Sequence, residues 1–140
     1  MTRRVSVASV DQFEWLALHD RSVSQDWVRR CIMLQEYLVL EDDRQEIGFI
    51  RWSRFWGEIP YMDMILIEPS FRNCGAGKLL YQHWEDEMVR LGVNLLMTSC
   101  ERDEPAPLRW HRKNGFEIVG EVEFPGLQES KEVFLAKRLV

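Results

Sequence analysis

The sequence has no basic segment of the kind that binds nucleic acids. Its formal net charge is −5, and no long block of Lys or Arg occurs in it. A sequence-independent contact with nucleic acid phosphates needs a basic face on the protein. We therefore expect no nucleic acid partner.

Long apolar runs are also missing. No stretch approaches the roughly 20 apolar residues that cross a bilayer as a helix. The arginines of the first segment, "MTRRVSVASVDQF", are followed by no apolar segment. These absences argue against a membrane partner and against a secretory signal peptide.

Cysteine is scarce, and its spacing excludes two kinds of site. The three cysteines are Cys31, Cys74 and Cys100, and no CxxC pair is present. An odd number of widely spaced cysteines suits reduced thiols better than a disulfide framework or a zinc site. We expect a cytoplasmic protein without a metal.

The composition that remains is that of an ordinary globular protein, with 46% hydrophobic and 29% charged residues. A chain of 140 residues fits a single domain, here residues 1–140. No internal repeat, low-complexity tract or linker divides it. The composition is compatible with many functions, so function must be read from local patterns.

The period of the apolar residues changes along the chain and predicts alternating kinds of element. Strands are predicted at residues 4–9, 37–41, 46–55, 61–69, 94–99, 116–124 and 132–139. Helices are predicted at 11–19 with Asp11 as cap, from Ser22 or Ser24 to Leu34, at 75–91 ended by Gly92, and at 106–114. The apolar run 94–99 predicts a central strand buried on both faces. Helices interrupting a mostly antiparallel sheet make an α+β, or mixed α/β, domain with about six or seven strands and about four helices.

The segment "RNCGAGKLL", residues 72–80, has the appearance of a phosphate-binding loop. A Walker loop is excluded because Arg72 stands at its first Gly position and Leu79 at its Ser/Thr position. A dinucleotide fingerprint is excluded because its third Gly position holds Leu80. Two interpretations remain, a turn that only begins a helix, or an anion site at the helix N-terminus. In the second, Gly75 and Gly77 allow close approach to unpaired backbone amides.

Two blocks of residues resemble one known family when they are taken together. The segment "ILIEPSFRNCGAGKLL" resembles the acetyl-CoA-binding segment of the GNAT superfamily of N-acetyltransferases, V-x-P-x-[YF]-[RQ]-x-x-G-x-[GA]. The matching residues are Ile67, Pro69, Phe71, Arg72, Gly75 and Gly77. The later block "LRWHRKNGFEIVGE" resembles the family's [FL]Y-x-K-x-G-F segment, with Trp110, Lys113, Gly115 and Phe116 in order. The predicted element order is also similar, although the part up to about Phe55 carries no specific motif.

The resemblance implies a GNAT-like fold with acetyl-CoA as co-substrate and no metal. The pyrophosphate would lie on the loop of Arg72, Asn73, Cys74, Gly75, Ala76, Gly77 and Lys78. The pantetheine arm would lie along the strand residues Ile65, Leu66 and Ile67. It would enter a slot formed where this strand splays from its neighbour.

The implied activity is an N-acetyltransferase reaction, in which an amine attacks the thioester directly. The acceptor would be the amine of a small molecule, a peptide N-terminus or a lysine. An alternative is an acyl-CoA-binding sensor that has kept the loop and lost the chemistry. The sequence leaves the acceptor and the oligomeric state open, a homodimer being one alternative.

Asp63 is the candidate base for this reaction and His111 the candidate acid. Asp63 is the lone acid of "YMDMILI", and strict alternation would place it on the same face as Ile65 and Ile67. Apolar neighbours raise the pKa of an acid, which suits a base. The alternative is a carboxylate that faces solvent or pairs with an arginine.

His111 stands where the family usually carries Tyr, and a histidine can donate a proton near neutral pH. The alternative is a helix histidine hydrogen-bonded to a neighbour. Glu104 stands near the family's usual Asn, with Pro105 and Pro107 altering the turn. The contacts of this turn are therefore left open.

The sequence gives only general indications about the acceptor side. Many aromatic residues lie in regions that wall the acceptor pocket in the family: Trp15, Trp27, Trp52, Phe55, Trp56 and Tyr61. Glu58 and Asp63 would attract a cation, whereas Arg51 and Arg54 would suit an acidic acceptor. Alternation places either Arg51 or Trp52 toward the interior.

Overall fold

The computed structural model describes residues 2–139 as one sheet with four helices. The strands are β1 Arg3–Val7, β2 Tyr37–Asp42, β3 Gln45–Phe55, β4 Ile59–Ile67, β5 Leu95–Glu101, β6 Glu117–Val122 and β7 Glu132–Arg138. The helices are α1 Phe13–His19, α2 Gln25–Met33, α3 Ala76–Arg90 and α4 Pro105–Lys113. This order confirms the predicted one, with short 3-10 turns added at Val10–Gln12 and Pro69–Phe71.

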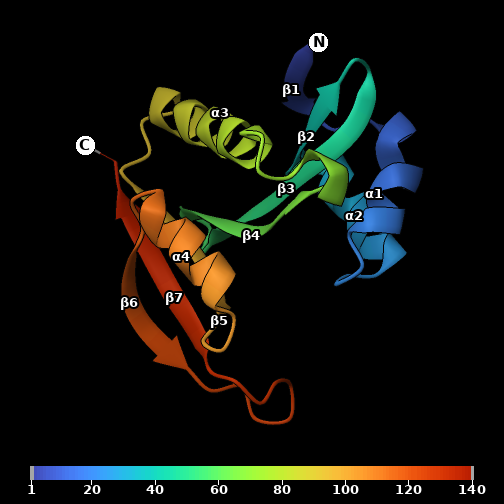
Figure 1. The fold of residues 1–140 in the computed structure, drawn as a ribbon. Helices are drawn as coiled ribbons and strands as arrows, with labels where there is room; N and C mark the ends of the chain where they lie inside the picture. The colour runs from blue at the N-terminus through green and yellow to red at the C-terminus, as the bar shows by residue number, and fades with distance from the viewer. Residues whose placement is uncertain (1, 140) are drawn as a thin grey trace.

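The strands form a single seven-stranded sheet in the order β1-β2-β3-β4-β5-β7-β6 (Figure 1). All neighbours are antiparallel except β4 and β5, which are parallel. That parallel ladder holds only Tyr61 opposite Met97 and Met62 opposite Thr98. Beyond these pairs β4 and β5 separate, so the predicted splay is present.

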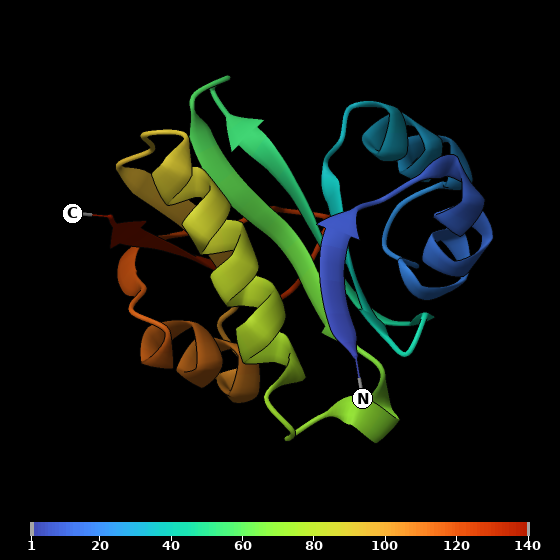
Figure 2. The same cartoon turned by 90° about the horizontal axis from the view of Figure 1, so that it is seen from above.

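Helices cover the two faces of the first half of the sheet. Helix α3 lies against one face of β2, β3 and β4, and α1 and α2 lie against the other (Figures 1 and 2). On the α3 side Leu80, Tyr81 and Trp84 are fully buried. On the opposite side Leu16 and Val28 pack against Phe49. Because both of its faces are buried, β4 is held in a fixed position, and it therefore positions the candidate site beside it.

The second half of the sheet is covered on one face only. In β5, Leu96, Thr98 and Cys100 are buried, and the residues between them are half-buried. The prediction of a strand buried on both faces is therefore wrong. The reason is that the cluster beneath α1 and α2 contains no residue of β5 or β7.

The helix ends agree in part with the sequence. Ser24 caps α2 by accepting a hydrogen bond from the Trp27 amide at 3.1 Å, and Gly92 follows α3 with φ +81°. Asp11 does not cap the first helix, because it lies inside the 3-10 turn that precedes α1. There the Gln12 side chain accepts from the Ser9 amide at 3.1 Å. No helix within residues 2–139 has the length and apolar character of a membrane span.

Candidate active site

A groove of about 700 Å³ lies between the end of β4, the loop that follows it and helix α4. It is lined by Ile65, Leu66, Ile67, Arg72, Asn73, Gly75, Gly77, Lys78, Ala106, Pro107, Trp110, His111 and Lys113. Most of the predicted cofactor-binding residues therefore share one cavity with His111. Cys74 and Ala76 do not line it. Ala106 and Pro107 were assigned no contact from the sequence.

The loop before α3 presents backbone amides at the groove. Gly75 is the N-cap of α3 and has φ +84°, a left-handed conformation that favours glycine. The first hydrogen bond of the helix runs from the Leu79 amide to the Gly75 carbonyl at 3.0 Å. The amides of Ala76, Gly77 and Lys78 precede that ladder, and the positive end of the helix dipole adds to them. This arrangement suits an anion.

Position 77 has room for only a small side chain, whereas Gly75 is favoured by its backbone conformation. A Cβ on Gly77 would lie 3.6 Å from the Trp110 ring and 3.7 Å from Ile67. A methyl group fits at these distances, but a longer side chain would meet Trp110 or fill the groove. In the described part of the chain, nothing lies within 4 Å of a Cβ on Gly75.

Side chains on both sides of the loop fix its course. Arg72 Nε donates to the Ile67 carbonyl at 2.9 Å, which closes the loop against the end of β4. The exposed Cys74 thiol donates to the Phe71 carbonyl at 2.7 Å. From the first strand, Arg3 donates to the Cys74 carbonyl at 3.4 Å. Sequence reasoning missed Arg3, because no motif signals a contact between positions so far apart.

Lys78 links the loop to helix α4. Its ammonium donates to Asn114 Oδ1 at 2.8 Å, and Asn114 is buried. Lys137 of β7 donates to the Asn114 carbonyl at 2.8 Å and to the Tyr81 hydroxyl at 3.1 Å, and it pairs with Glu85. This network holds α4 beside α3, so the two walls of the groove keep their spacing.

His111 faces the groove from α4 and is only 5% exposed. Its ring lies edge-on to Trp110 and Phe116, with centroids 5.6 and 6.0 Å away. Burial lowers the pKa of His111 to about 4, and its Nδ1 has no hydrogen-bond partner among residues 2–139. The imidazole is therefore neutral near pH 7. In that state it can donate a hydrogen bond, whereas a proton-donating imidazolium is scarce.

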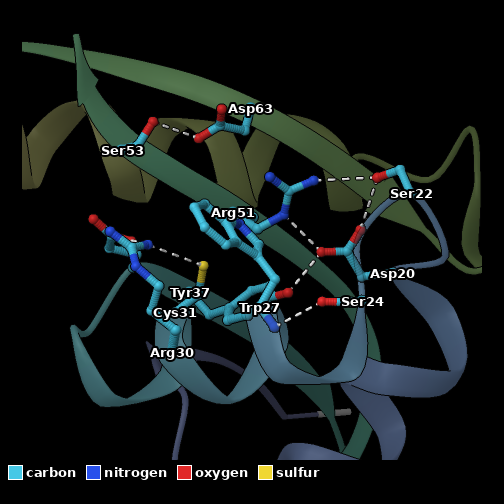
Figure 3. Close-up of polar contacts among 11 residues, drawn as sticks. Asp20, Ser22, Ser24, Trp27, Arg30, Cys31, Tyr37, Arg51, Ser53 and Asp63 are labelled. Atoms are coloured by element: carbon cyan, nitrogen blue, oxygen red, sulfur yellow. Dashed lines mark hydrogen bonds and ion pairs between the residues drawn. The ribbon is translucent and has the colours of Figure 1, made fainter.

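Asp63 lies on β4 just before the groove, at a β-bulge. The β3–β4 register shifts between Arg51 and Trp52, so Asp63 has no cross-strand partner. Its carboxylate accepts a hydrogen bond from Ser53 Oγ at 2.7 Å and points toward the α2 side (Figure 3). Ile65 and Ile67 pack on the α3 side instead. The prediction that Asp63 shares their face is wrong, because the bulge breaks strict alternation.

Burial raises the pKa of the Asp63 carboxyl, against the lowering effects of the Ser53 hydrogen bond and the nearby Arg51 charge. A carboxylate with a raised pKa takes up a proton more readily. The groove reaches Ile65 on one side of the strand and Asp63 lies on the other. The β4–β5 separation lies beside both positions.

Arg51 faces the interior, as one of Arg51 and Trp52 was predicted to do. It is 7% exposed, and its Nε donates to Asp20 at 2.7 Å (Figure 3). Asp20 also accepts from the Tyr37 hydroxyl at 2.6 Å. The guanidinium is therefore neutralised within the fold. Arg54 stacks over the Trp52 ring at 5.1 Å. Neither arginine supports an acidic acceptor beside Asp63.

The groove offers hydrogen-bond donors to an anion. Within residues 2–139, no group of three or more His, Cys, Asp or Glu side chains is placed to hold a metal ion. The unpaired amides of the loop and the Lys78 ammonium are hydrogen-bond donors. A ligand with an anionic group at one end and an apolar arm would suit these donors and the apolar Ile65–Ile67 wall.

Comparison with known sequences places these elements in a family context. A family model described as "Acetyltransferase (GNAT) domain" matches residues 34–118. The peptidyl-lysine N-acetyltransferase YjaB of Escherichia coli (strain K12) is 28% identical over 115 residues. That alignment covers 81% of this chain and 71% of YjaB.

Solved structures share the fold at lower identity. Ard1 from Thermoplasma volcanium superposes with a TM-score of 0.86 at 15% identity, covering 100% of this chain and 99% of Ard1. The PaiA N-acetyltransferase from Thermoplasma acidophilum, solved in complex with coenzyme A, gives a TM-score of 0.72 at 17% identity. That match covers 99% of this chain and 100% of PaiA. At these identities the likeness concerns the fold.

Proposed function

Because this chain belongs to the GNAT acetyltransferase family, we propose that it transfers an acetyl group from acetyl-CoA to a primary amine of a small molecule or a peptide. One observation carries the proposal. The groove leads from the amides at the α3 N-terminus to the β4–β5 separation, and Asp63 lies beside that separation. An anionic cofactor and an amine would thus approach the same opening from opposite faces of the sheet.

The loop would bind the pyrophosphate through its backbone. The amides of residues 76–78 precede the α3 hydrogen-bond ladder, and anions are stabilised at helix N-termini. The pantetheine arm would bond to main-chain groups of Ile65–Ile67, which lie along the groove where β4 has left β5. These contacts use backbone atoms, so the side chains of Asn73 and Cys74 contribute little.

Asp63 would act as the general base. A protonated amine cannot attack a thioester, so a base must first remove a proton. The half-buried carboxylate of Asp63 has the raised pKa that this step requires. As the C–N bond forms and the C–S bond breaks, the CoA thiolate leaves. His111 faces the groove that would hold the thiol arm, where its ring would donate a hydrogen bond to the leaving sulfur.

One observation favours the alternative, an acyl-CoA-binding sensor without catalysis. The usual tyrosine is replaced by His111, whose pKa of about 4 leaves it neutral near pH 7. A sensor would bind acetyl-CoA in the groove and release no thiol. The position of Asp63 beside the β4–β5 separation supports catalysis, because a carboxylate there could take a proton from an amine that enters the opening.

We expect the wild-type protein to release CoA thiol from acetyl-CoA when amines are offered. A Gly77→Leu variant should bind acetyl-CoA at least about 10-fold more weakly, which is a loss of about 1.4 kcal/mol in binding free energy. The leucine side chain would extend past the 3.6 Å available toward Trp110 and fill the groove. Thiol release is followed with a thiol reagent across a panel of small amines, lysine peptides and free peptide N-termini. Binding is followed by calorimetry.

Gly77→Ala is the matched control, because its methyl group meets Trp110 and Ile67 at ordinary contact distances. It should bind acetyl-CoA nearly as wild type does. Tight binding without turnover on any amine would favour the sensor. Failure of the wild-type protein to bind acetyl-CoA would refute both functions.

His111 gives a separate expectation for stability. Its pKa is about 4 in the folded chain and about 6.5 when unfolded, so the unfolded state takes up the proton first as pH falls. The His111 contribution to the free energy of unfolding should therefore decline from pH 6.5 to 4, by on the order of 3 kcal/mol. His111→Phe should lack this part of the pH dependence in urea titrations.

The exposed His83 provides the control, since His83→Gln should keep the wild-type pH dependence. If the free energy of unfolding changes equally with pH in wild type and His111→Phe between pH 6.5 and 4, His111 is not buried in a neutral state. Turnover of His111→Phe, measured on the same preparations, tests the contribution of its hydrogen bond to catalysis.

A further inference from the structure

Three side chains on neighbouring strands form a continuous hydrogen-bonded chain near Asp63. The Tyr61 hydroxyl on β4 contacts Ser99 Oγ on β5, and Ser99 Oγ donates to Glu132 Oε2 on β7 at 2.5 Å. The second carboxylate oxygen of Glu132 accepts from Gln128 Nε2 at 3.0 Å, which fixes the orientation of the carboxylate. All three members of the chain are half-buried.

The direction of the protons in this chain follows from its end. An ionised carboxylate can only accept hydrogen bonds, so Ser99 must give its single hydroxyl proton to Glu132. The Ser99 oxygen is then free to accept, and the Tyr61 hydroxyl must donate to it. The Tyr61 oxygen keeps its lone pairs for a further donor. The chain is therefore set to take a proton at Tyr61 and pass it to Glu132.

Tyr61 lies at the opening where the reaction would occur. It is opposite Met97 in the short β4–β5 ladder, immediately before the strands separate. It is also the cross-strand partner of Ser53, whose hydroxyl donates to Asp63, so Tyr61 and Asp63 face the same side of the sheet. The Phe134 ring stacks on the Tyr61 ring with centroids 6.3 Å apart, which holds the phenol in place.

We propose that Tyr61, Ser99 and Glu132 form a proton relay that accepts one of the protons lost by the acceptor nitrogen, an inference that rests on the proposed acetyl transfer. Tyr61 would be the catalytic residue of the relay, because it is the member next to the β4–β5 separation, where the acceptor nitrogen would lie. Ser99 and Glu132 act through Tyr61 and are positioning residues.

The proton balance of the reaction leaves one proton that must be carried to solvent. An ammonium acceptor loses one proton before it attacks the thioester and another as the amide forms. The departing thiolate takes up one proton, so one more must reach solvent. Asp63 would receive one of the two and give it up to the thiolate, which leaves Asp63 ionised for the next turnover.

The relay receives the other as an N–H bond breaks and an O–H bond forms at Tyr61. The phenol proton then passes to Ser99 Oγ, and the serine proton passes to Glu132. Glu132 becomes a neutral carboxylic acid and, being only half-buried, returns the proton to water. No atom is oxidised or reduced, and only N–H and O–H bonds change.

The relay is tested with Tyr61→Phe, Ser99→Ala and Glu132→Gln. Each should lower kcat by about 100-fold, the lower end of the range for loss of one assisted proton transfer, and change KM for acetyl-CoA by less than about twofold. In mixtures of H2O and D2O, kcat of the wild type should follow a curved proton inventory, because several protons move together. The variants should give a linear one, a difference that a loss of packing would not produce.

Glu101→Gln is the matched control for charge. Glu101 is the cross-strand partner of Glu132 on β7, and within residues 2–139 its side chain makes no hydrogen bond or ion pair. It should keep the wild-type kcat and the curved inventory. A kcat within twofold of wild type in Tyr61→Phe, or a curved inventory in Ser99→Ala, would overturn the relay while leaving the proposed acetyl transfer intact.

A measurement without turnover completes the test. The Tyr61 hydroxyl proton should be protected from exchange and visible by proton NMR in the wild type. It should be lost in Tyr61→Phe and Ser99→Ala and shifted in Glu132→Gln. A freely exchanging Tyr61 hydroxyl would show that the hydrogen-bonded series from Tyr61 to Glu132 does not form. A protected hydroxyl in a protein that acetylates no amine would remove the catalytic role together with the proposed function.

Discussion

Replacing Asp63 with asparagine should lower turnover by about 100-fold or more and leave acetyl-CoA affinity nearly unchanged. The amide keeps the shape of the side chain and its contact with Ser53 but cannot accept a proton from the amine. Asp63 lies on the α2 side of β4, away from the groove lining, so cofactor contacts should persist. The measurement is kcat from thiol release, with acetyl-CoA affinity from calorimetry on the same preparation.

The pH dependence gives a second readout for Asp63. The base is active only when ionised, and burial raises its pKa, so the rate of the wild type should fall at a higher pH than for an exposed aspartate. In Asp63→Asn, the rate should no longer show this decrease as the pH falls. Glu58→Gln, a charge change at the exposed β3–β4 turn, is the control and should keep it. Wild-type rates in Asp63→Asn would clear Asp63 of the role of base.

Replacing Asp20 with alanine should lower the free energy of unfolding by about 3–5 kcal/mol, because a buried guanidinium is left without its counter-charge. Asp20 is 1% exposed, and its carboxylate accepts hydrogen bonds from Arg51 at 2.7 Å and Tyr37 at 2.6 Å. The loss in free energy of unfolding is large because Arg51 and Tyr37 would stay buried without the carboxylate that accepts their hydrogen bonds. Urea unfolding at neutral pH measures this free energy. Its dependence on urea concentration should be compared with that of wild type, to detect a change in the compactness of either state.

The double variant Asp20→Leu, Arg51→Met should recover part of that loss, since no buried charge remains unpaired. Asp26→Ala is the control, because its pair with Arg29 on α2 is exposed and should contribute little. A loss below about 1 kcal/mol in Asp20→Ala would show that water reaches Arg51 when its partner is removed.

The turn that begins α3 was predictable from sequence because its signals are local. Pro69 begins the 3-10 turn after β4, Gly75 takes a left-handed conformation, and Gly77 leaves the groove open, so the effect of each residue is confined to its own position. The element order followed from apolar periodicity for the same reason.

The position of Asp63 was less predictable because it depends on pairing between strands. Alternation along β4 cannot reveal the bulge, which arises from the register of β3 against β4. Its face was therefore predicted wrongly, although its location on the strand was correct. The burial of His111 also escaped prediction, because Trp110 and Phe116 surround it only after α4 docks.

Contacts between distant positions left no signal in the sequence at all. Arg3 reaches Cys74, and Tyr61 reaches Ser99 and through it Glu132. Each contact joins strands that become neighbours only in the finished sheet. Residue types at these positions are compatible with many other arrangements.

The short β4–β5 ladder divides the sheet into two half-sheets, β1–β4 and β5–β7. Besides the two paired positions, Thr98 Oγ1 joins them by donating to the Met62 carbonyl at 3.0 Å, and Lys137 joins β7 to α3. A molecule lying between Ile65–Ile67 and α4 would touch both halves at once. Binding there would stabilise the contact between the two half-sheets. The ligand would therefore raise the stability of the folded domain in addition to being its substrate.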